Sequence, residues 1–141
     1  MKRIGYSIFF STLLLIVIGC APPVPDVPTL TKVDSKTESD GLQNHMILYT
    51  VNGAFDSNEF LTLCKSLKSN PVTSGFNYIV VFDDAANAGF PTTPFSSLYG
   101  LEENRMKHIV AIYEYNAVNG FSQSVVYTPN MWTGKPIATK L

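Results

Sequence analysis

Side chains able to transfer protons or bind a metal ion gather between residues 83 and 108. Asp83 and Asp84 follow an apolar stretch, Glu102 and Glu103 come later, and His108 ends the segment. Carboxylates and an imidazole together suit a divalent metal or general acid–base catalysis. The spacing matches neither the H-E-x-x-H motif nor an EF-hand loop, and acids after a strand are more often turn formers or helix caps. We therefore expect no resident metal or cofactor.

An enzyme is the alternative interpretation of this segment. Asp83, Asp84 and His108 would then serve a small hydrolytic or metal-dependent activity. The sequence does not exclude a Ser-His-Asp triad, because the members of a triad need not be close in the sequence. The G-x-S-x-G motif and the glycine-rich phosphate loops are both absent. Paired acids alone are weak evidence for catalysis, so we expect a protein without enzymatic activity.

Cys64 is the one cysteine after residue 20, which raises the question of a catalytic nucleophile. It shares the helical spacing i, i+3, i+4 and i+7 with Phe60, Leu63 and Leu67. A thiol on such an apolar stripe is buried, and burial makes it unreactive. We expect Cys64 to be a core residue.

The N-terminus has the layout of a secretory signal peptide. Lys2 and Arg3 precede an apolar run of 15 residues, from Ile4 to Ile18. The run leads into Val17-Ile18-Gly19-Cys20, and this sequence resembles the lipobox of bacterial lipoproteins. The resemblance covers about the first 21 residues.

The lipoprotein resemblance implies a processed, lipid-anchored chain. In that family the cysteine, here Cys20, is diacylated on sulfur, the peptide before it is cleaved, and the new amine is acylated. Two or three acyl chains anchor a protein stably, whereas one does not. Ala21 stands where Asp favours inner-membrane retention in enterobacterial lipoproteins, so the resemblance implies the outer membrane. The alternatives are an uncleaved anchor or a buried helix, but the run is short of the ~20 residues that a spanning helix needs.

Length and charge narrow the class further. The chain has 141 residues, 45% of them hydrophobic and 15% charged, which indicates one folded domain and excludes a wholly disordered chain. The net charge is −1, and no basic cluster follows Arg3. Nucleic-acid binding needs a basic surface, so we expect no nucleic-acid partner. Two cysteines are too few for a disulfide scaffold.

We divide the chain into a signal peptide (1–19), a lipid-anchored linker rich in Pro, Ser and Thr (20–44) and a small domain (45–141). Strands are expected over 46–51, 76–82, 108–116 and 121–128, with an irregular tail over 129–141. A helix over 57–69 is expected to start at Asp56, and Glu59 has the spacing of a capping box. This order predicts an α+β fold, in which one main helix packs on a roughly four-stranded, mainly antiparallel sheet with a C-terminal β-hairpin.

Asn119-Gly120 predicts a two-residue hairpin turn, which would place Tyr113 opposite Val126 and Tyr115 opposite Ser124. Both faces of this hairpin are then apolar near its base, while one helix covers only one face. The second face needs a cover: the segment 83–106, the tail that holds Trp132, or another protein.

The segment 83–106 is longer than most connections, and such loops are commonly functional. Its aromatic residues and those near the hairpin are our candidates for a partner-binding surface, because rigid aromatic anchors dominate binding energy. These candidates are Phe90, Phe95, Tyr99, Tyr113, Tyr115 and Trp132. In the alternative interpretation, Phe90, Phe95, Leu98 and Tyr99 fold back onto the open sheet face.

These observations together predict a membrane-anchored envelope lipoprotein of the binding or adaptor type. It would present its domain to an envelope protein or to a second copy of itself. An immunity or inhibitor lipoprotein is a subclass of this prediction, and the sequence leaves open whether the domain is periplasmic or surface-exposed.

Overall fold

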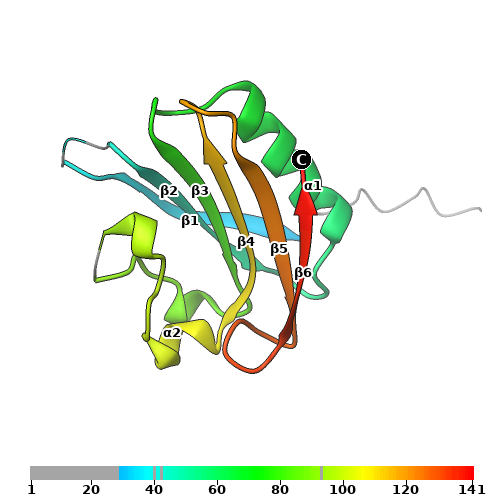
Figure 1. The fold of residues 1–141 in the computed structure, drawn as a ribbon. Helices are drawn as coiled ribbons and strands as arrows, with labels where there is room; N and C mark the ends of the chain where they lie inside the picture. Colours follow the sequence, from blue (N-terminus) through cyan, green and yellow to red (C-terminus); the bar gives the residue numbers. More distant parts are fainter. Residues whose placement is uncertain (1–28, 40, 42, 93) are drawn as a thin grey trace, which may run out of the picture.

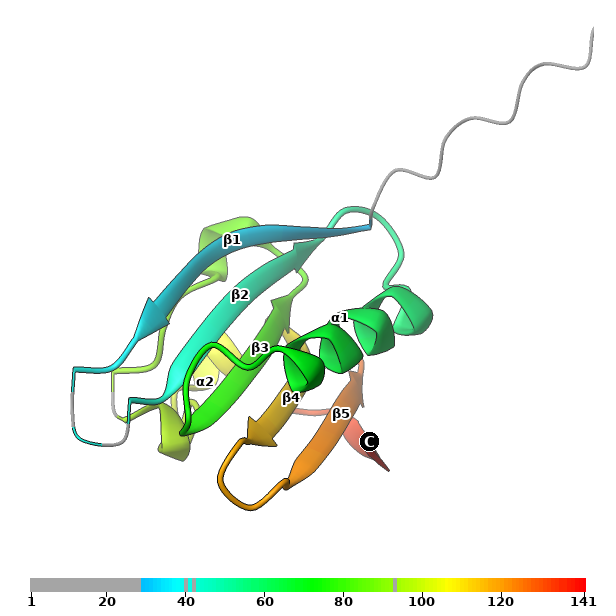
Figure 2. The same ribbon diagram turned by 90° about the horizontal axis from the view of Figure 1, so that it is seen from above.

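The computed structural model describes residues 29–141, apart from residues 40, 42 and 93. These residues form one six-stranded sheet whose strands follow in chain order (Figures 1 and 2). Neighbouring strands are antiparallel except β2 and β3, which are parallel and are joined through helix α1 (Ser57–Ser69). The strands are β1 (Leu30–Thr37), β2 (His45–Val51), β3 (Phe76–Phe82), β4 (Ile109–Asn116), β5 (Ser122–Thr128) and β6 (Lys135–Lys140).

The prediction of a four-stranded sheet with a C-terminal hairpin is wrong, because two edge strands complete the sheet. β1 lies within the stretch expected to be linker, and β6 lies in the expected irregular tail. Both are mostly exposed, so they lack the alternation of apolar residues by which a half-buried strand is found. Lys135, Pro136 and Lys140 are residues that an edge strand tolerates and a central strand does not.

Helix α1 has the predicted bounds, and the Asp56 side chain caps it by accepting from the Asn58 amide at 2.8 Å. Glu59 does not complete the capping box. Its carboxylate accepts instead from the amides of Thr29 at 2.9 Å and Leu30 at 3.2 Å. The first turn of α1 therefore fastens the start of β1.

The turn between β4 and β5 is longer than predicted. Tyr113 faces Ser124 rather than Val126, and Tyr115 faces Ser122 rather than Ser124. A type I′ turn needs positive φ at both central residues, but only Gly120 of the Asn119-Gly120 pair has it, at +72°. The register moves by two positions, so every residue stays on its predicted face.

The sheet separates two hydrophobic cores. On one face α1 packs Phe60, Cys64 and Leu67 against residues such as Ile79 and Tyr113. On the other face, Leu48, Val80 and Ile112 pack against side chains of the segment 83–106. Strand β3 is buried on both faces, as its apolar centre predicts.

Residues 83–106, which we call the covering segment, lie on the sheet face opposite α1 (Figures 1 and 2). The segment contains two short 3₁₀ helices, Ala85–Asn87 and Phe95–Ser97, and helix α2 (Glu103–Met106). Phe95 and Tyr99 are buried against the sheet, and Phe90 and Leu98 pack beside them. The fold-back alternative is confirmed: the segment covers much of the face that the helix leaves open.

Candidate functional site

The acid–imidazole group predicted around His108 is partly assembled. Asp83 begins the covering segment and His108 follows its end, and the Asp83 amide donates to the His108 carbonyl oxygen at 2.9 Å. Their side chains meet with 2.9 Å between Asp83 Oδ1 and His108 Nδ1. A carboxylate that orients an imidazole through Nδ1 is half of a hydrolytic centre, with Nε2 left to act as a general base.

The remaining acids of this region act on neighbouring groups rather than on a shared ligand. Asp84 caps the first 3₁₀ helix, accepting from the Ala86 amide at 2.9 Å and from the Asn87 side chain at 2.6 Å. These hydrogen bonds hold the pKa of the Asp84 carboxyl below its usual value. Glu103 pairs with Lys107 one turn further along α2. Within the described part of the chain, no three His, Cys, Asp or Glu side chains lie close enough together to hold a metal ion.

Cys64 is a free, fully buried thiol on the predicted apolar stripe of α1. Burial raises its pKa to about 12, because the thiolate is poorly solvated in the core. The thiolate is the nucleophilic form, so Cys64 is unreactive at neutral pH. The prediction of a core thiol is confirmed.

The six aromatic candidates for partner binding do not form one surface. Phe95, Tyr99 and Tyr113 are buried core residues, so a partner cannot contact them in this structure. Phe90 is half-buried and stacks on Phe95, with 5.6 Å between the ring centroids. The other two are half-buried Tyr115, on the opposite face of the sheet, and exposed Trp132, between β5 and β6.

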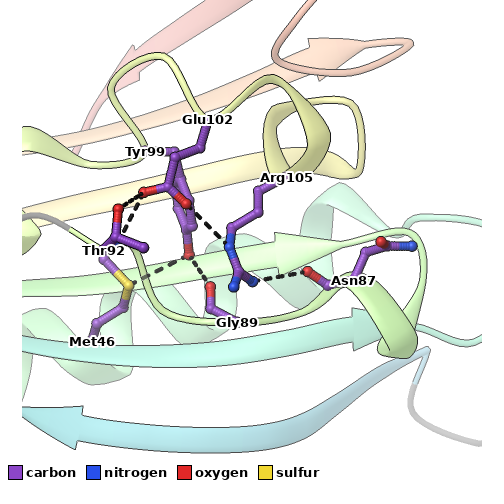
Figure 3. A network of polar contacts seen from close by, with 7 residues as sticks. All are labelled: Met46, Asn87, Gly89, Thr92, Tyr99, Glu102 and Arg105. Carbon is purple, nitrogen blue, oxygen red and sulfur yellow. Dashed lines mark hydrogen bonds and ion pairs between the residues drawn. The ribbon is translucent and has the colours of Figure 1, made fainter.

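A polar network fixes the covering segment on the sheet (Figure 3). The Tyr99 hydroxyl donates to the Gly89 carbonyl oxygen at 2.9 Å and lies 3.6 Å from the sulfur of Met46 in β2. Glu102 accepts from the Thr92 amide at 2.8 Å and from its hydroxyl at 2.9 Å. Arg105 contacts the second Glu102 oxygen at 3.2 Å. The network holds the segment in place, and the polar side chains in it form hydrogen bonds and an ion pair with one another rather than with a ligand.

A second group of polar side chains lies where β3 begins, next to the start of β2 and the end of β4. Buried Asn44 accepts from the Phe76 amide at 3.1 Å and donates to Glu38 at 2.9 Å. Glu38 also accepts from the Phe95 amide at 2.7 Å, which joins the covering segment to this region. Because Thr29 and Leu30 lie beside the other end of β2, we call this region the distal end of the sheet.

Asn77 determines the shape of the loop before β3. Its side-chain oxygen accepts from the amides of Val72 at 2.9 Å and Thr73 at 3.1 Å. Its side-chain nitrogen donates to the carbonyl oxygens of Thr73 at 3.0 Å and Gly75 at 3.1 Å. All four hydrogen-bonding sites of this fully buried amide are occupied, so the distal loop is firmly placed.

The distal end holds a pocket of about 280 Å³. Its wall combines the apolar side chains of Phe76 and Val118 with polar groups of Asn44, Ser96 and Asn116. Val118 is 81% exposed, and Val72 and Phe121 are further exposed apolar residues at this end. Apolar walls with a few fixed polar groups are typical of binding pockets. The distal end is therefore our candidate for a binding surface.

Sequence reasoning missed this surface. Asn77 lies inside a strand that is otherwise apolar. An asparagine at such a position indicates a side chain that forms hydrogen bonds with the backbone of a neighbouring loop. Val118 stands beside the turn residues Asn119 and Gly120, where an apolar residue is unusual. Neither signal reveals that the loop before β3 and the β4–β5 turn adjoin, because that contact depends on strand order.

The proposed lipid attachment residue, Cys20, lies outside the described residues, and so does the whole predicted signal peptide. Among the residues that are described, no helix is long and apolar enough to cross a membrane. Comparison with known proteins found no matching family, no matching curated protein and no matching solved structure.

Proposed function

We propose that this protein is a lipid-anchored envelope protein that binds a protein partner through the distal end of its sheet. Its anchor is the lipidated Cys20, in line with the lipobox resemblance, and Ala21 favours the outer membrane. The domain acts by binding and carries out no catalysis. The partner is an envelope protein or a second copy of the same chain.

The observation that carries this proposal is that Thr29, the first described residue after the proposed anchor, lies at the end of the sheet opposite the distal pocket. Eight residues lie between Cys20 and Thr29, so the connection can span at most about 30 Å. Thr29 is fixed to Glu59 at the near end of the sheet. The strands are seven or eight residues long, which puts the distal pocket roughly 20–25 Å further from the anchor. A membrane-tethered domain meets its partner most readily with the end that lies farthest from the lipid.

Crosslinking in intact cells tests the proposal. The wild-type chain and Cys20→Ser are treated with a short chemical crosslinker, and the captured proteins are identified by mass spectrometry. We expect one specific partner for the wild type, or the chain itself, and its loss in Cys20→Ser. Equal capture of the same proteins by both forms would contradict a role that depends on the anchor.

The contact between Asp83 and His108 favours a second candidate function, a small hydrolase or metal-dependent enzyme. His108→Ala and Asp83→Asn should then abolish turnover of ester or phosphoester substrates while the fold persists. In the metal-dependent version, a divalent cation should also raise the melting temperature of the wild type by mass action, and both variants should lose that shift. The absence of both effects would remove this candidate.

A further inference from the structure

Glu114 is a partly buried acid whose carboxylate has no protein partner among the described residues. It lies on β4, on the sheet face that carries the covering segment, directly between Tyr78 of β3 and Gln123 of β5. None of the hydrogen bonds or ion pairs among the described residues involves its side chain. Every other glutamate of the described chain is held by such a contact: Glu38, Glu59, Glu102 and Glu103.

Aromatic side chains lie near Glu114 on this face of the sheet. Tyr78 faces it across the strands, and Phe76 stacks on Tyr78 with 5.6 Å between the ring centroids and 10° between the ring planes. Tyr127 lies on the same face of β5. Burial is the main cause that raises the pKa of Tyr78 and of Tyr127, and the negative charge of Glu114 raises both further. Both tyrosine hydroxyl groups are therefore close enough to interact electrostatically with the carboxylate.

Among the described residues, no Lys or Arg side chain forms an ion pair with this acid. By register, Lys140 lies beside Gln123 and is the first basic residue on this face beyond Glu114, but no ion pair joins the two. Glu38 contributes a second negative charge near Tyr78. The pKa of Glu114 is raised by burial alone, as expected for a carboxylate without a nearby positive charge. This patch thus combines negative potential with aromatic surface.

The patch adjoins the distal pocket. Phe76 and Asn116 line the pocket, and Tyr78 and Glu114 are the next residues on the same face of the same two strands. Two residues along a strand span roughly 7 Å, which is about the length of a lysine side chain. A group that enters beside Phe76 can therefore bring its end to Glu114.

From this arrangement we infer that the protein partner is recognised through a lysine side chain. Its ammonium pairs with the Glu114 carboxylate, and its hydrocarbon stem lies along the Phe76 ring. A divalent metal ion is a poorer match, because calcium takes six to eight oxygen ligands and one unpaired carboxylate supplies two at most. An alkylammonium group matches both the single charge and the aromatic wall. This inference rests on the proposed function, because it names what the distal end binds.

A titration followed by ¹H–¹⁵N NMR tests the inference, with the full chain in dodecyl maltoside micelles. The probe is Nα-acetyl-lysine methylamide, and its Nε-acetylated form is the neutral control. We expect saturable shifts of the amides of Tyr78, Tyr115 and Gln123 with the charged probe alone. Glu114→Gln should raise the dissociation constant at least fivefold, whereas Glu103→Gln, an exposed acid on α2, should leave it unchanged.

The inference is overturned if the charged probe causes no saturable shifts at these amides. It is equally overturned if the neutral probe or the Glu114→Gln variant gives the same shifts, since the charge pair would then be irrelevant. The spectrum of each variant shows directly whether it is folded, and the comparison of the two probes on the wild type needs no variant. Partner capture at the distal end without lysine binding would refute this inference and leave the proposed function standing.

Discussion

Acidic residues in this protein hold distant segments together. Glu59 fastens the start of β1 to α1, Glu38 joins the loop after β1 to the covering segment, and Glu102 holds Thr92 within that segment. Each accepts hydrogen bonds from backbone amides, and a charged acceptor makes such bonds stronger than a neutral one. The acids that suggest catalysis in the sequence are therefore mostly structural, and the Asp83–His108 contact is the exception that keeps an enzymatic hypothesis open.

Glu102→Gln should weaken the attachment of the covering segment. Gln keeps one acceptor for Thr92 but loses the charge that strengthens these bonds and pairs with Arg105. We expect a loss of about 1 kcal/mol in the free energy of unfolding, measured by urea denaturation. Glu103→Gln is the matched control, because it removes only an exposed pair with Lys107 and should cost no more than about 0.5 kcal/mol. Equal effects of the two substitutions would show that the network in Figure 3 carries no stability.

The stability difference between the wild type and Glu102→Gln should also depend on pH. Burial alone would raise the pKa of Glu102, but the hydrogen bonds from Thr92 and the Arg105 charge outweigh it and lower the pKa below the usual 4.5. A lowered pKa means that the ionised form stabilises the fold above the unfolded-state pKa. The difference in stability between wild type and Glu102→Gln should be complete at pH 7 and shrink as the pH falls below 4.5 and through the folded-state pKa. A difference that grows on acidification would contradict this assignment.

Cys64 should resist thiol reagents in the folded protein. In the Cys20→Ser chain it is the only thiol, and its pKa of about 12 leaves almost no thiolate at pH 8. Reaction with Ellman's reagent should be at least 100-fold slower in buffer than in 8 M urea. Rapid labelling of the folded chain would show that α1 does not bury this residue.

At the scale of elements, the covering segment replaces the second layer of helices that a sheet buried on both faces ordinarily requires. It has little regular structure, so its position depends on Phe95 and Tyr99 and on the bonds in Figure 3. Few regular backbone hydrogen bonds and many side-chain contacts mark a segment that can open before the rest of the fold.

Phe95→Ala should therefore detach the covering segment. Removing a buried phenylalanine ring costs about 3–4 kcal/mol in the free energy of unfolding. Hydrogen exchange should increase over residues 85–106 more than in the strands. Leu101→Ala is the control within the same segment, because Leu101 is 91% exposed and its loss should change stability by less than about 0.5 kcal/mol. A uniform increase in exchange across the sheet would instead make the segment part of the global folding unit.

Helices and strands with a clear apolar periodicity were predictable from the sequence. Elements that are defined only by pairing with a neighbouring strand or loop were not. The apolar stripe and Asp56 predict α1 to the residue, and the apolar centre of β3 predicts its burial on both faces. β1 and β6 escape prediction because edge strands bury few side chains and only pairing identifies them. The distal pocket could not be predicted for the same reason, because the loop before β3 and the turn between β4 and β5 adjoin only through the order of the strands.

At the scale of the whole molecule, the position of β1 changes how the domain is tethered. The stretch expected to be a linker (20–44) instead contributes a strand, so only the part before Thr29 can act as a connection. In the proposed lipid-anchored protein, such a shorter connection would keep the domain near the membrane and orient it, because the chain enters at the near end of the sheet. The distal end would then point away from the membrane surface.

The central claim is that the distal end is the binding surface, and site-specific photocrosslinking in intact cells tests it most directly. A benzoylphenylalanine replaces Val118 at the distal end or Leu101 at the near end, both of which are exposed and tolerate a bulky group. We predict that position 118 captures one specific protein, or a second copy of the chain, and that position 101 does not. Specific capture at position 101 alone, with none at 118, would contradict the account.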